Sequence, residues 1–151
     1  MADDARVSYG QCRCAAVRFS VAAPPLITAA CHCRGCQRMT ASAFSVSALY
    51  PADRFKVIAG RTVLGGLRGA TQHHFCAACM SWLFTYPEGL SDYVNVRITL
   101  LDDADSLSPF IETYVAEKVS WASTPAEFSF AHQPSAEELP GLVAEFASRQ
   151  R

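Results

Sequence analysis

Seven cysteines in three short clusters are the residues of this sequence best suited to chemistry. The clusters are Cys12-x-Cys14, Cys31-x-Cys33-x-x-Cys36 and Cys76-x-x-Cys79. Gaps of one or two residues let a single turn present two sulfurs to one ion, and zinc favours tetrahedral thiolate sites. The odd number of cysteines excludes a complete set of intrachain disulfides. The pattern predicts metal sites rather than buried free thiols, which have no reason to recur at these gaps.

A redox Cys-x-x-Cys motif is an alternative, but such motifs begin a helix in a βαβ unit, and the chain shows no βαβ pattern. Seven thiols divide into four, which close a structural zinc site, and three, which leave a coordination position open for catalysis. The spacing alone leaves two divisions open. Cys33, Cys36, Cys76 and Cys79 could form a zinc-ribbon site, or the first and last clusters could combine and leave a local trio of Cys31, Cys33 and Cys36.

Short strands separated by turns must position these cysteines. Alternating patterns and short apolar runs predict strands at residues 17–21, 42–48, 55–58, 71–75, 81–86, 93–98 and 111–115. Residues 1–8 are expected to be a polar lead-in, and residues 27–30 a short apolar approach to Cys31. A single helical turn is predicted at residues 34–40. The best helix candidate covers residues 140–148, after a capping box from Ser135 to Glu138.

Length and composition indicate one mainly β domain over residues 1–151. Hydrophobic residues make up 50% and charged residues 18%, which excludes a disordered chain. A formal net charge of −1 argues against nucleic acid or an anionic membrane as the main partner. The acidic start and the lack of a long apolar run give no sign of a secretion signal or a membrane span. We therefore expect a cytoplasmic protein, in which thiols stay reduced.

Four segments together resemble the glutathione-dependent formaldehyde-activating enzyme family, which includes the centromere protein V group. They are Gly10-Gln11-Cys12-Arg13-Cys14, Cys31-His32-Cys33-Arg34-Gly35-Cys36-Gln37-Arg38, Ser42-Ala43-Phe44 and Phe75-Cys76-Ala77-Ala78-Cys79. Leu101-Asp102-Asp103, Pro109, Lys118 and Trp121 fit the same pattern downstream. The resemblance is specific because the three cysteine clusters occur together and in register.

The resemblance implies a β-tent, or Mss-type, fold of several small coiled antiparallel sheets with few short helices. It also implies two zinc ions per chain. Cys12, Cys14, Cys76 and Cys79 would hold a structural zinc, while Cys31, Cys33 and Cys36 would hold the reactive zinc as the catalytic residues. The family's named reaction adds glutathione to formaldehyde, which makes it a carbon–sulfur lyase in the reverse sense. The implied partners are a small glutathione-like thiol and a small electrophile.

Three thiolates lower the acidity of a zinc ion compared with three histidines, which favours activation of an incoming thiol over activation of water. The alternative function is a non-catalytic zinc module that binds or carries glutathione or serves as an interaction domain. A zinc-ribbon nucleic-acid binder is a third interpretation, which the acidic balance disfavours.

Four side chains beside the trio are candidates for substrate binding: His32, Arg34, Gln37 and Arg38. The arginines could hold a carboxylate through paired hydrogen bonds, or could offset the thiolate charge. His32 could donate a proton or a hydrogen bond to a substrate, although a side chain between two ligands usually points away from the metal. His73 and His74 fall on opposite faces of a predicted strand, so a shared metal is not expected there.

The sequence departs from the family pattern at three places. Ala15 and Met80 stand where glycine is usual, and glycine permits a positive φ that is costly for other residues. The turns around the structural site are therefore expected to differ. The family often has a histidine in a Pro-x-His-Ile segment, whereas residues 109–112 read Pro-Phe-Ile-Glu here, which bears on the choice of substrate.

Overall fold

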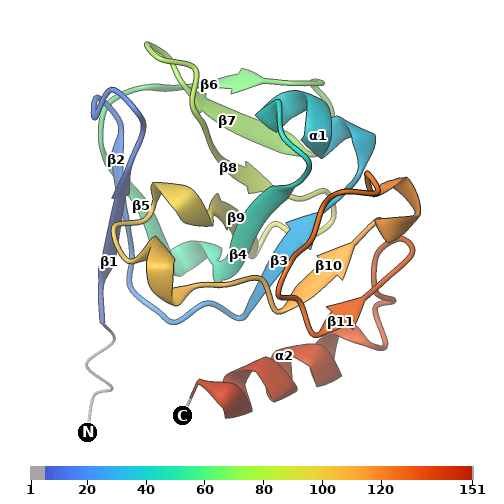
Figure 1. The fold of residues 1–151 in the computed structure, drawn as a ribbon. Coiled ribbons are helices and arrows are strands. Elements are labelled where there is room, and N and C mark those ends of the chain that lie inside the picture. The colour runs from blue at the N-terminus through green and yellow to red at the C-terminus, as the bar shows by residue number, and fades with distance from the viewer. Residues whose placement is uncertain (1–5, 151) are drawn as a thin grey trace, which may run out of the picture.

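The computed structural model describes residues 6–150 and confirms the mainly β class, with eleven strands in two sheets over that range (Figure 1). The small sheet has the order β1-β2-β5 and contains β1 (Ser8–Gln11), β2 (Arg18–Val21) and β5 (Phe55–Ala59). The large sheet has the order β11-β10-β3-β4-β9-β8-β7-β6. Its strands are β3 (Ile27–Cys31), β4 (Ser45–Pro51), β6 (Thr62–Gly65), β7 (Gln72–Cys76), β8 (Trp82–Tyr86), β9 (Tyr93–Arg97), β10 (Ile111–Thr113) and β11 (Phe128–Ser129).

Strand pairing is antiparallel throughout these residues except at β10, which runs parallel to both β3 and β11. The parallel pairing places Thr113 beside Cys31. The residues after β10 therefore lie next to the second cysteine cluster, about 80 positions away in the sequence.

Most predicted strands form, with bounds that differ by a few residues. The strand expected at residues 42–48 is β4, which begins only at Ser45, and residues 27–30 belong to a full strand, β3, that runs to Cys31. The lead-in expected at residues 1–8 gives way to β1 at Ser8. Gly10 makes this strand possible, because a Cβ atom there would lie 2.5 Å from the Phe19 ring.

Both predicted helices form, and they lie at opposite ends of the molecule (Figure 1). α1 (Arg34–Thr40) follows β3, and α2 (Leu139–Arg149) includes Pro140 in its first turn. The capping box is present: the Glu138 amide donates to Ser135 Oγ at 3.2 Å, and the Ser135 amide donates to the Glu138 carboxylate at 2.8 Å. Neither these helices nor the shorter 3-10 turns are long and apolar enough to cross a membrane.

The two faces of the large sheet differ in character. One face contributes Ala48, Val94 and Val96 to the main core, which is shared with the small sheet. By register, the other face carries Cys31 opposite Ser45, and Ser47 opposite Arg97. A second core joins α2 to β3 and β10 through Ile27, Ile111, Leu142 and Phe146. The second cysteine cluster therefore lies on the face of the sheet that carries Ser45, Ser47 and Arg97.

Candidate metal centres

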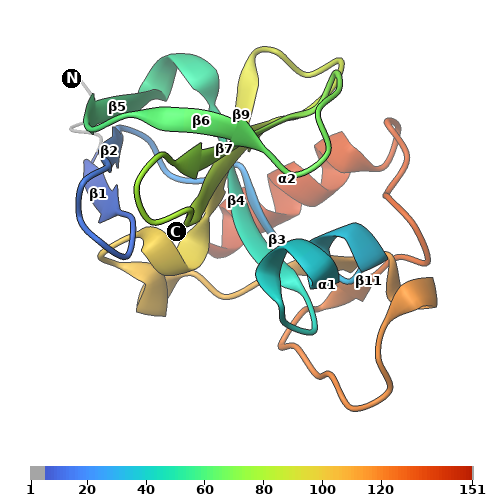
Figure 2. The ribbon, with the colours of Figure 1, turned by 90° about the horizontal axis from the view of Figure 1, so that it is seen from above.

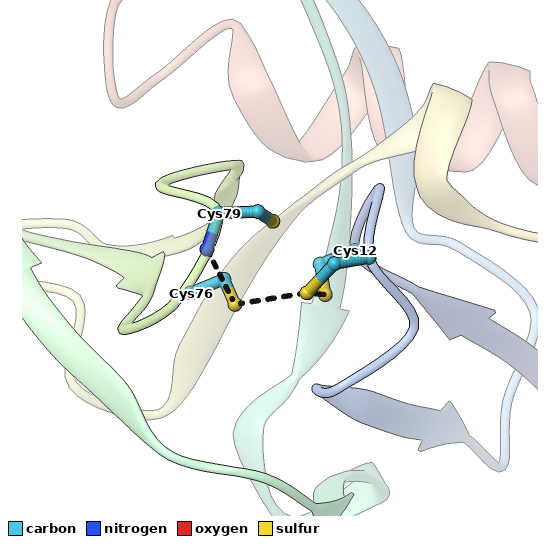
Figure 3. Close-up of side chains that lie close together, drawn as sticks. Cys12, Cys76 and Cys79 are labelled. Atoms are coloured by element: carbon cyan, nitrogen blue, oxygen red, sulfur yellow. Dashed lines mark hydrogen bonds between the residues drawn. The ribbon is translucent and has the colours of Figure 1, made fainter.

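Four sulfur atoms from the first and third cysteine clusters of the sequence meet in one group, which we call the four-cysteine site. Cys12 and Cys14 come from the turn after β1, Cys76 ends β7, and Cys79 lies in the turn between β7 and β8. Figure 3 shows the side chains of Cys12, Cys76 and Cys79 close together. The sulfurs of Cys12 and Cys14 are 3.5 Å apart, and those of Cys14 and Cys76 are 3.9 Å apart. A tetrahedral zinc with 2.3 Å bonds to sulfur would separate its ligands by about 3.8 Å, so the spacing fits zinc.

Backbone amides around the four-cysteine site point at its sulfurs. The Val17 amide lies 3.3 Å from Cys12 Sγ, and the Ala78 and Cys79 amides each lie 3.4 Å from Cys76 Sγ. The Ser81 hydroxyl, 3.1 Å from Cys79 Sγ, is the main cause that lowers the pKa of Cys79 to about 5. The donors at Cys12 and Cys79 stabilise the thiolate, which is the form of the side chain that binds a metal.

The turns at this site keep the left-handed backbone conformation despite the loss of glycine. The φ angles are 63° at Ala15 and 59° at Met80. The expectation that these turns would differ is wrong. The Ala15 and Met80 amides donate to the carbonyls of Cys12 and Cys76, so each turn closes around its first cysteine. Ala15 and Met80 therefore hold a positive φ, which is a strained conformation for a residue with a Cβ atom.

The remaining three cysteines form a separate cluster, the cysteine trio. Cys31 ends β3, Cys33 caps α1, and Cys36 lies in the first turn of that helix. Their sulfurs lie within 4.8 Å of one another, and all three residues are half-buried. The structure thus groups the cysteines as four and three, and does not show the zinc-ribbon pairing of Cys33 and Cys36 with Cys76 and Cys79.

Hydrogen bonds within the trio favour ionisation of the Cys31 thiol before the thiols of Cys33 and Cys36. The Cys36 amide lies 3.3 Å from Cys33 Sγ. The Cys36 thiol is the largest influence that lowers the pKa of Cys31, to about 5, and the Thr113 hydroxyl acts in the same direction. The same hydrogen bond raises the pKa of the Cys36 thiol, which acts as the donor. The trio is therefore arranged to share negative charge among its sulfurs.

The structure separates the four candidate substrate-binding residues into two kinds. Arg34 and Arg38 are exposed on α1 beside the trio. Gln37 Nε2 donates to the carbonyls of His32, at 2.7 Å, and Glu117, at 3.0 Å. His32 differs from the expectation, because its side chain has no exposed surface and packs against Phe44. Figure 2 shows the segment after β10 lying beside α1, where these contacts form.

Glu112 is a buried residue of this region that sequence reasoning did not assign to the site. Its carboxylate accepts hydrogen bonds from His32 Nε2 at 2.9 Å, Thr124 Oγ1 at 2.9 Å, Ser129 Oγ at 2.7 Å and Lys118 Nζ at 3.2 Å. Burial by itself raises the pKa of Glu112, but these donors together lower it to about 2. The departure from Pro-x-His-Ile at residues 109–112 was the sequence signal that marked this position.

The family model for the glutathione-dependent formaldehyde-activating enzyme matches residues 7–117, which include both cysteine clusters. The chain belongs to this family. The chain is also similar to a Rhodobacter sphaeroides protein of known crystal structure, at 22% identity and a TM-score of 0.53, over 62% of this chain and 87% of that one. This likeness concerns the fold alone. A comparison with curated proteins finds no match.

Membership of the formaldehyde-activating family gives the two clusters a chemical context. Both are groups of thiols that could hold metal ions, and the donor set of each suits zinc. The family suggests a lyase-like activity with glutathione and an aldehyde as small-molecule partners. Of the two clusters, only the trio has fewer than the four protein ligands that close a structural zinc site.

Proposed function

We propose that the protein is a cytoplasmic carbon–sulfur lyase-type enzyme that adds a glutathione-like thiol to a small aldehyde such as formaldehyde, or reverses that addition. The observation that carries this proposal is the separation of Cys31, Cys33 and Cys36 from the four-cysteine site. Three ligands on a half-buried surface leave room for a fourth from the substrate. The family match supports the same reaction class.

The trio supplies the thiolate environment of the reaction. Zinc bound there would favour the thiolate form of an incoming thiol, because three protein ligands leave one coordination position open. The thiolate sulfur then forms a bond to the aldehyde carbon, and the π electrons of the carbonyl move to its oxygen, which takes up a proton. Cys31, Cys33 and Cys36 act as the metal-binding residues in this scheme, so two zinc ions are expected per chain.

The exposed arginines suit a different task from the buried polar residues. Arg34 and Arg38 project from α1 beside the trio and are proposed to bind a carboxylate of the thiol substrate. His32 and Gln37 are positioning residues in this account. His32 is anchored by Glu112, and Gln37 ties the loop between Cys31 and Cys33 to the segment at Glu117.

Exchange spectroscopy tests the activity directly. Glutathione and ¹³C-formaldehyde form a hemithioacetal without a catalyst, and nuclear magnetic resonance measures the exchange rate between free and glutathione-bound formaldehyde. We expect the zinc-loaded protein to accelerate this exchange and Cys33→Ser to abolish the acceleration. Wild-type protein that binds glutathione but leaves the exchange rate unchanged would instead indicate the non-catalytic binding module.

Arginine variants test the carboxylate contact. Arg34→Met and Arg38→Met are expected to raise KM for glutathione, while Arg54→Met serves as the control. Arg54 is exposed and follows the far end of β4, a strand of about 20 Å that begins next to the trio. An equal effect of all three substitutions would contradict the assignment of Arg34 and Arg38.

A further inference from the structure

Arg97 is a buried cation that forms no ion pair with a carboxylate among residues 6–150. Arg97 is the last residue of β9 and is 8% exposed. Its Nε atom is buried without a hydrogen-bond partner. The guanidinium carbon instead lies 3.9 Å from the centre of the Trp82 ring. A cation–π contact of this kind holds the group in place and leaves its Nε–H without an acceptor.

The register of the large sheet places Arg97 on the same face as the trio. Cys31 pairs with Ser45, and Ser47, two residues further along β4, pairs with Arg97. The two backbone positions are therefore about 10 Å apart across two strands and about 7 Å apart along them. The long side chain of Arg97 therefore lies on the same face of the sheet as Cys31.

The buried charge calls for a physical reason. Burial lowers the pKa of Arg97 to about 10, and the Cys36 and Cys31 thiolates act in the opposite direction, so the group stays positively charged at neutral pH. The thiolates offset part of the cost of burying this cation, but its Nε–H still has no acceptor, and an apolar side chain would avoid that cost. Such a donor beside the trio makes sense if an anion arrives there during function.

We propose that Arg97 is an anion-binding catalytic residue of the trio site, and that its guanidinium donates hydrogen bonds to the oxygen that becomes negative when a thiolate adds to an aldehyde. This inference rests on the proposed function. As the carbon–sulfur bond forms, the carbonyl π electrons pass to that oxygen, which Arg97 stabilises until it takes a proton from water. The site thereby favours small substrates whose oxygen lies one or two atoms from the reacting sulfur.

Two small thiols separate this role from binding at the exposed arginines. Mercaptoacetate and 2-mercaptoethanol both offer a sulfur with an oxygen close by, but only mercaptoacetate carries a negative charge on that oxygen. Isothermal titration of both thiols into zinc-loaded protein measures the preference without any turnover. We expect mercaptoacetate to bind wild type at least about tenfold more tightly, the size expected of one charge-assisted hydrogen bond.

The substitution Arg97→Met is expected to remove this preference while leaving the affinity for 2-mercaptoethanol and the zinc content unchanged. Arg97→Gln is the second variant, in case the first fails to fold, and Arg54→Met is the control that should keep the preference. Persistence of the preference in both Arg97 variants would overturn the inference. Failure of wild type to bind either thiol would overturn the proposed function and this inference together, whereas equal binding of both thiols by wild type would overturn only the inference.

Discussion

Glu112 and His32 form a buried hydrogen bond of 2.9 Å between Oε2 and Nε2, although they lie 80 positions apart in the sequence. His32 is the residue between Cys31 and Cys33, so this contact fixes the loop that presents two of the three sulfurs. The His32 amide also donates to the Thr113 carbonyl at 3.0 Å. The trio is therefore held by β10 and the segment that follows it, as well as by its own helix.

The substitution Glu112→Gln should destabilise the fold and change its dependence on pH. Because the folded-state pKa of Glu112 is lowered from 4.5 to about 2, its contribution is fully present above about pH 4.5 and is lost as the pH falls through about 2. Urea unfolding at several pH values should show wild-type stability falling more steeply than that of Glu112→Gln between pH 4.5 and pH 2. We expect a loss of about 2–4 kcal/mol at neutral pH from breaking this buried network.

The exposed Glu88 provides the control for this experiment. Glu88→Gln should keep the wild-type slope between pH 4.5 and pH 2. If Glu88→Gln and Glu112→Gln showed the same slope, Glu112 would not be the group that couples acid to stability.

Gln37 should control how long the trio retains its metal. The substitution Gln37→Leu removes the hydrogen bonds to the carbonyls of His32 and Glu117. Substitution of a residue that orients metal ligands typically lowers metal affinity by about 10- to 100-fold. The zinc ion of the trio should therefore transfer to a chromophoric chelator at least about tenfold faster in Gln37→Leu than in wild type. Stopped-flow absorbance measures the two release phases. The exposed Gln72 offers a matched control, since Gln72→Leu should leave both phases unchanged.

Two adjacent alanines test the strain at the four-cysteine site. Ala15 has a φ of 63°, whereas Ala16 is not among the residues with positive φ, and both are exposed. Ala15→Gly should stabilise the protein by about 0.5–1 kcal/mol because glycine tolerates the left-handed conformation. Ala16→Gly should destabilise it by a similar amount because it only adds freedom to the unfolded chain. Equal effects in urea unfolding would mean that the Ala15 turn carries no strain.

The sequence predicted the elements whose signals are local. The alternating strands around Cys76, the helical turn at residues 34–40 and the capping box at Ser135 all depend on neighbouring residues. β1 was missed because its pairing depends on Gly10 fitting against Phe19, and β6 and β11 are short edge strands. Local signals for such strands are weak, since their stability comes from tertiary contacts.

The residues of the candidate site also divide into those that local sequence signals predicted and those that depend on contacts between distant segments. The cysteine clusters were evident from their spacing, but spacing could not decide which clusters combine, because that depends on which turns meet in space. The burial of His32 and the roles of Glu112 and Arg97 were also hidden. Each of these side chains acts through partners on other strands, such as Trp82 for Arg97, and no local pattern encodes such contacts.

Zinc per chain, measured on wild type and on Cys33→Ser, tests the central claim that the trio is a metal site of its own. Both proteins should be purified under reducing conditions without a chelator, and thermal unfolding should be recorded for each. We predict two equivalents in wild type and one in Cys33→Ser, with the folded structure retained, because the four-cysteine site contains none of the substituted atoms. One equivalent in both proteins, or loss of zinc together with loss of the fold, would contradict the account.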